Sequence, residues 1–152
     1  MELNIKQDID APIAFVFEQM TDFDAHERRA VMAGLSVIRT AQSPDEVIWK
    51  AAFDFRGKIR KVDLRLYDII APEQMLIELK GQQLEMLSDA KLIELSPELT
   101  RLRLKLSMTG KTLKARLLVQ SARLAKQNII RRLQSRLAGL ASEIEDEYLE
   151  AR

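Results

Sequence analysis

The chain's only histidine lies within a dense group of ionisable side chains near the amino terminus. Asp22, Asp24 and Glu27 surround His26, and two arginines follow directly. Such a group could act in acid–base catalysis or hold a metal ion. Zinc, however, usually takes more than one histidine or cysteine, and the spacing and glycine of a calcium-binding EF-hand are absent. Helix capping explains the acids more simply, with Thr21 and Asp24 as cap candidates and Asp24–Glu27 resembling a capping box, so no metal site is predicted.

The composition is typical of a globular protein. The 152 residues fit a single domain, with 47% hydrophobic and 31% charged residues. The net charge of +1 gives no overall attraction to nucleic acid or to anionic membranes. The absence of cysteine excludes thiol nucleophiles, thiolate metal sites and disulfides. Neither a signal peptide nor an apolar run of membrane-spanning length is present, which predicts a cytoplasmic protein.

The charges are distributed unevenly along the chain. Residues 1–27 carry seven acids against one base, residues 111–136 carry eight bases and no acid, and residues 143–150 carry five acids. The acidic amino-terminal segment is predicted to lie against the basic segment and compensate its charge. Nucleic-acid binding is not predicted, because the basic segment has no aromatic residues for stacking and the net charge is low.

Hydrophobic periodicity divides the chain into three parts. Residues 3–9 alternate as a strand, and a proline at position 12 predicts a helix over 12–21, followed by a short helix over 24–33. Between residues 35 and 109 a period of two, broken by turn sequences, predicts an antiparallel meander that brings the total to about seven strands. From 111 to 147 an uninterrupted helical period predicts one helix of about 50 Å, which must pack across the sheet.

Three stretches carry a family resemblance: "IDAPIAFVFEQMTDF" at 9–23, "FDFRGKIRKVDLRL" at 53–66, and the helix over 111–147. Together with the order of elements they resemble the helix-grip fold of the START-like (SRPBCC) superfamily, which includes polyketide cyclases/dehydratases and lipid-transfer domains. The resemblance implies an α+β fold in which a curved antiparallel sheet wraps around the long helix. It implies one domain over 1–152 that binds an apolar or amphipathic small molecule in a cavity between sheet and helix. It implies no catalytic residues, because the superfamily shares none.

The apolar faces of the predicted strands supply candidate cavity residues. Most of these side chains must form core, and some should line the cavity. On the long helix, Leu124 and Asn128 widen the apolar stripe, whereas Arg132 and Arg136 interrupt it. These arginines are candidate anchors for a carboxylate or phosphate; alternatively they extend to solvent or pair with an amino-terminal acid. The strand candidates are Trp49, Phe53, Phe55, Leu64, Leu66, Met75, Ile77, Leu104 and Leu106.

Three functions stay open on the sequence alone. The first is non-catalytic binding of a lipid-like or polyketide-like molecule, without metal or cofactor. The second is an enzyme of the cyclase/dehydratase kind, for which Arg60, Asp68 and Glu94 are the inward-facing polar candidates. The third is a protein-interaction module whose cavity has collapsed. In the first two cases His26 is expected near the cavity rim rather than as a catalyst, and a homodimer is compatible with all three.

Overall fold

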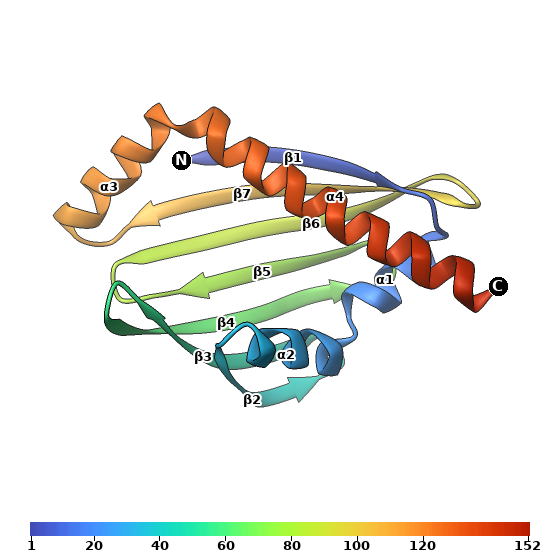
Figure 1. Cartoon of the computed structure of the whole chain (residues 1–152), viewed down its shortest axis with the longest axis horizontal. Coiled ribbons are helices and arrows are strands. Elements are labelled where there is room, and N and C mark those ends of the chain that lie inside the picture. Colours follow the sequence, from blue (N-terminus) through green and yellow to red (C-terminus); the bar gives the residue numbers. More distant parts are fainter.

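Seven antiparallel strands form one sheet in the order β1–β7–β6–β5–β4–β3–β2. The computed structural model describes all residues 1–152. Strands that follow one another in the sequence pair as hairpins from β2 to β7, and β1 pairs with β7 (Figure 1). The predicted antiparallel sheet of about seven strands is therefore confirmed. The strands are β1 Glu2–Ile9, β2 Ser36–Ser43, β3 Glu46–Phe55, β4 Lys58–Ile70, β5 Gln74–Lys80, β6 Leu84–Ser96 and β7 Leu99–Gly110.

One face of the sheet is apolar because the period-two pattern is kept in register from strand to strand. Successive side chains of a strand point to opposite faces, so residues paired across strands share a face. The outer face carries most of the charged residues, and the inner face turns toward the helices. One continuous row across the inner face consists of Val47, Leu66, Ile77, Ser88, Leu106 and Leu3.

Two short helices follow β1 and two longer ones end the chain. They are α1 Ile13–Met20, α2 Phe23–Met32, α3 Leu113–Leu124 and α4 Lys126–Ala151. α3 packs along β7 and α4 along β1, so both cover the same side of the sheet (Figure 1). The predicted α+β architecture, with two short helices after the first strand and a helical C-terminal segment packed on the sheet, is confirmed.

The prediction of one unbroken helix over 111–147 is wrong, because the helix is divided at Ala125. This residue has φ −101° and ψ 17°, and its amide donates to the carbonyl of Ala122, three residues back rather than four. Alanine is the strongest helix former, so the local sequence carries no signal for the break. The two halves pack on different strands, α3 on β7 and α4 on β1, so tertiary packing overrides the local helix propensity at the break. α4 also extends beyond the predicted end, to Ala151.

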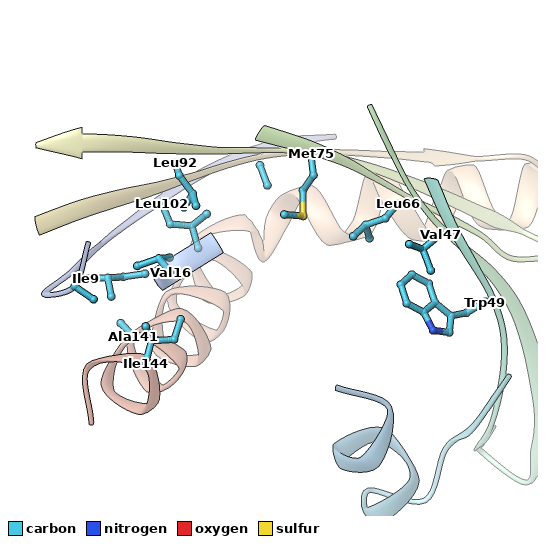
Figure 2. Packing of buried hydrophobic residues seen from close by; sticks show 12 residues of the cluster. Ile9, Val16, Val47, Trp49, Leu66, Met75, Leu92, Leu102, Ala141 and Ile144 are labelled. Atoms are coloured by element: carbon cyan, nitrogen blue, oxygen red, sulfur yellow. The ribbon is translucent and has the colours of Figure 1, made fainter. Parts of the chain in front are cut away.

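The buried core consists of two connected groups of side chains (Figure 2). Val47, Trp49 and Leu66 lie together on β3 and β4, and Met75 lies between them and the second group. Thr100 is fully buried beside the second group, and its hydroxyl donates to the carbonyl of Ala11 at 2.8 Å, which ties β7 to the β1–α1 connection. The second group, where α1 and α4 meet the sheet, comprises Ile9, Val16, Leu92, Leu102, Ala141 and Ile144.

Candidate functional site

An apolar pocket of about 430 Å³ lies between the inner face of the sheet and helices α1 and α2. Its volume is within the range of small-molecule sites. Fourteen of its sixteen lining residues are hydrophobic, and the two exceptions are His26 and Glu27. The apolar lining consists of Met20, Phe23, Ala30, Leu35, Val37, Trp49, Ala51, Phe53, Val62, Leu64, Leu66, Met75, Ile77 and Leu79.

The position of this pocket corrects the expectation of a cavity beneath the C-terminal helix. No residue of α3 or α4 lines it. α4 packs mainly along β1, at one edge of the sheet, whereas the pocket lies over β3, β4 and β5. The wall facing the sheet is therefore formed by α1 and α2.

Six of the predicted cavity residues line the pocket, and all come from β3, β4 and β5. They are Trp49, Phe53, Leu64, Leu66, Met75 and Ile77.

The other apolar candidates lie elsewhere. Leu104 and Leu106 are on the inner face of β7, where Leu104 packs against the core. Phe55 is 52% exposed at the end of β3, and Leu124 is 93% exposed at the end of α3. Asn128 is also exposed. The assignment of Leu124 to the cavity wall is corrected, because the break at Ala125 ends α3 with this side chain in solvent.

The helical wall of the pocket was missed by the sequence reasoning. Met20, Phe23 and Ala30 come from α1 and α2 and face the strand residues across the pocket. The sequence signal for Met20 and Phe23 was an apolar helix face over 12–21 and an aromatic residue two positions after it. That periodicity shows which side of a helix is buried, but not which part of the sheet it covers.

A polar network borders the pocket beside Trp49, and Glu27 is its lining residue. The indole Nε1 donates to Glu27 Oε1 at 2.8 Å, and Arg39 Nε donates to the same oxygen at 2.7 Å. Arg39 also donates through Nη2 to Asp24 Oδ1 at 2.7 Å. Phe23 meets the indole edge-on, with ring centroids 5.3 Å apart. The indole N–H is therefore satisfied, and the ring is held in one orientation in the pocket wall.

The network keeps Glu27 ionised. The hydrogen bonds from Arg39 and then from Trp49 hold the pKa of the Glu27 carboxyl below its ordinary value. A carboxylate that is kept ionised and paired in this way has no proton to donate and is a weak base. Its observed contacts orient Trp49 and Arg39.

His26 is held by both of its ring nitrogens. Nε2 lies 2.9 Å from the carbonyl oxygen of Met20, and Nδ1 lies 3.3 Å from Arg29 Nη1. Because a carbonyl only accepts and a guanidinium only donates, the proton belongs on Nε2. His26 therefore lines the pocket as predicted for the cavity rim, with no ring nitrogen free to act on a ligand.

Of the three neighbouring acids only one caps a helix, and it is a different residue from the one predicted. The Asp22 carboxylate accepts from the amide of Ala25 at 3.2 Å and caps α2. α2 begins at Phe23, one residue earlier than predicted, so the cap also moves toward the amino terminus. Asp24 consequently lies inside the helix and pairs with Arg39.

The predicted charge compensation between residues 1–27 and 111–136 does not form. Asp8 pairs with Arg101 at 2.7 Å, and the acids of α2 pair with Arg39. In the basic segment only Lys111 forms an ion pair, with Glu85 at 3.0 Å. The basic side chains of α3 and the first half of α4 thus have no acidic partner within the molecule.

Arg132 and Arg136 are exposed and do not line the pocket. Helical periodicity places them on the same flank of α4 as Leu140 and Glu143. That flank faces α1 and α2, since Leu140 and Glu143 line a groove together with Arg29. Their assignment as ligand anchors stays a prediction.

Replacing Glu27 with glutamine should lower stability by about 1 kcal/mol at neutral pH, because a charge-assisted hydrogen bond becomes a neutral one. The lowered pKa of Glu27 adds stability above the ordinary glutamate pKa, about 4.3, and this stability is lost as the pH falls through the folded-state pKa. Urea unfolding between pH 7 and pH 3 should therefore show a smaller acid-induced loss in Glu27→Gln.

The matched control for this prediction is Asp8→Asn. Arg101 lowers the pKa of Asp8 in the same way, but far from Trp49. Both variants should reduce the acid-induced loss, whereas only Glu27→Gln should shift the fluorescence of Trp49. An unchanged fluorescence spectrum in Glu27→Gln would contradict the hydrogen-bond assignment.

Solved structures share this architecture across almost the whole chain. The Zhui aromatase/cyclase from Streptomyces sp. R1128 superposes with a TM-score of 0.70 at 14% identity, covering 95% of this chain and 93% of that one. TTHA0849 from Thermus thermophilus gives a TM-score of 0.69 at 15% identity, covering 95% and 97%. A START superfamily protein from Mycobacterium smegmatis gives 0.58 at 14% identity, covering 91% and 98%. The chain has the START-like helix-grip fold.

At these identities the likeness concerns the START-like fold and not the ligand or the activity. No protein-family model and no curated protein sequence matches the chain. None of its helices is both long enough and apolar enough to span a membrane. What this version of the START-like fold can do therefore depends on its own pocket and surfaces.

Proposed function

We propose that the chain binds an apolar or amphipathic small molecule, lipid-like or polyketide-like, in the pocket beside Trp49. The observation that carries the proposal is the pocket wall, with fourteen hydrophobic residues around about 430 Å³. Burying apolar surface contributes about 25 cal/mol per Å², so an apolar ligand gains affinity along the whole wall. The shared fold with an aromatase/cyclase and a START superfamily protein supports this proposal.

Binding is favoured over acid–base catalysis by the state of the polar groups. His26 and Glu27 are the titratable residues of the wall, and both are engaged in hydrogen bonds within the protein. Of the inward-facing candidates, Asp68 and Glu94 are exposed, and neither they nor Arg60 line the pocket. A reaction would need a free acid or base within reach of the ligand.

The single tryptophan makes the proposal directly testable. Trp49 is the chain's only tryptophan and lines the pocket, so a fatty acid brominated on its chain should quench its fluorescence on contact. We expect saturable quenching, and displacement by unbrominated fatty acids of increasing length. Each added buried methylene should strengthen binding by about 0.8 kcal/mol, or about fourfold, until the pocket is full.

A second pair of variants locates the bound molecule and its anchor. In the variant Trp49→Phe/Leu87→Trp the fluorophore moves to the outer face of β6, and quenching should disappear. Arg132→Gln/Arg136→Gln tests the separate prediction that these arginines, which do not line the pocket, anchor a carboxylate: the affinity for a fatty acid should fall by about tenfold while that for the matching alcohol stays unchanged. Absence of saturable quenching in the wild-type chain would refute the proposed function.

A further inference from the structure

An apolar stripe without a partner runs along α3. Leu113, Leu117 and Leu124 fall within an arc of about 40° at 100° per residue. They are 74%, 56% and 93% exposed. The opposite face of α3 packs on β7 and buries Ala115 and Val119. α3 therefore has two apolar faces, and only one of them meets the sheet.

Basic side chains border this stripe on both sides. Lys114 lies on one side, and Arg116 and Arg123 lie on the other. Residues 111–136 contain eight bases and no acid, and only Lys111 among them has an ion-pair partner. A helix with leucines on an exposed face and cations along its borders is suited to the interface of an anionic bilayer.

The β3–β4 hairpin, like α3, combines exposed apolar side chains with basic ones. Its two-residue turn, Arg56 and Gly57, has φ of 53° and 77°, the positive values that a tight hairpin requires. The turn leaves Phe55 52% and Ile59 72% exposed on either side of it. Residues 55–62 contain four bases and no acid. Figure 1 shows this turn and the beginning of α3 at the same end of the sheet.

The opposite end of the molecule is acidic. The last turns of α4 carry five acids over residues 143–150, and the carboxyl terminus lies at the far end from the start of α3 (Figure 1). A molecule with this charge separation orients near a negatively charged surface with its basic end toward the surface.

We propose that the basic end of the molecule, formed by α3 and the β3–β4 hairpin, docks on an anionic lipid bilayer. The exposed leucines, Phe55 and Ile59 enter the interfacial region, and the lysines and arginines meet lipid phosphates. Pairing of the stripe with a second copy is disfavoured, because a two-fold contact would bring the basic borders of both copies together. The proposal concerns this surface alone and does not depend on whether the pocket holds a ligand.

The test is co-sedimentation of the full chain with phosphatidylcholine vesicles, with and without phosphatidylglycerol. We expect at least about fivefold more protein to pellet with the anionic vesicles, and most of this gain to disappear at high salt. Leu113→Ser/Leu124→Ser should reduce the pelleted fraction by about fivefold. The matched control, Leu95→Ser/Leu149→Ser, changes two exposed leucines near the ends of β6 and α4 and should pellet like the wild type.

Charge reversal tests whether binding depends on the proposed surface or on the positive charge of the protein as a whole. Lys58→Glu/Lys114→Glu should lose the preference for anionic vesicles, whereas Lys6→Glu/Lys105→Glu, the same change on the outer face of the sheet, should keep it. Thermal unfolding confirms that each variant is folded. Equal pelleting with neutral and anionic vesicles, or a serine variant that pellets like the wild type, would overturn the proposal. So would a dimer in sedimentation velocity that the serine substitutions convert to a monomer.

Discussion

Ala51→Phe should weaken binding of the brominated fatty acid by about 100-fold, or about 2.7 kcal/mol, while the protein stays folded. Ala51 lines the pocket opposite Val62, on the inner face of β3. A benzyl group at this position projects into the open volume and occupies space that the ligand would need. The measurement is a titration that follows Trp49 fluorescence, accompanied by thermal unfolding of the free protein.

The adjacent residue provides a matched control. Ala52 lies on the same strand but points to the outer face, where it pairs with Ser36 and Lys61. Ala52→Phe makes the same chemical change and should alter the affinity by less than about twofold. If both variants, or neither, lose binding while remaining folded, the ligand does not occupy the pocket beside Trp49.

Leu102→Ala should lower the free energy of unfolding by about 3 kcal/mol, within the range known for buried leucines. Leu102 is 1% exposed on β7 and belongs to the core group where α1 and α4 meet the sheet. Truncation leaves a cavity that the surrounding strands cannot close, because β1 and β6 hold β7 on both sides. Urea unfolding monitored by circular dichroism measures the loss.

Leu87→Ala is the matched control for the loss of stability expected in Leu102→Ala. Leu87 lies on β6, the neighbouring strand, but faces outward and is 42% exposed. Its truncation removes the same atoms without opening a buried cavity, so the expected cost is below about 1 kcal/mol. Equal losses in the two variants would contradict the assignment of the inner face as the buried face.

The assignment of sheet faces could be made from the sequence because it depends on a local rule. Alternation in β3, β4 and β7 identified the inner residues, and register then aligned them across strands. The same rule predicts Trp49, Phe53 and Leu64 as inner-face residues, and all three line the pocket. The proline at position 12 likewise predicted the start of α1 within one residue.

The break at Ala125 and the place of the pocket were decided only in the tertiary structure. Nothing in the run "RLAKQ" disfavours a helix, and the break arises because α3 and α4 pack on different strands. The same packing moves α4 to the β1 edge and leaves the inner face of β3–β5 to α1 and α2. The exposure of Leu124 and the unpaired cations of α3 follow from that arrangement.

The amino-terminal cluster shows the same division between local and tertiary causes. From the sequence alone, the acids around His26 indicate a capped helix start, and one of them, Asp22, does cap α2. That Glu27 instead holds the indole of Trp49 and the guanidinium of Arg39 depends on contacts between residues 12 and 22 positions apart. Periodicity is set by neighbours along the chain, so the sequence alone determined the strands, the faces and, within two residues, the starts of α1, α2 and α3. Which helix closes which part of the sheet is set by packing among distant segments, so only the folded chain decided where the pocket lies.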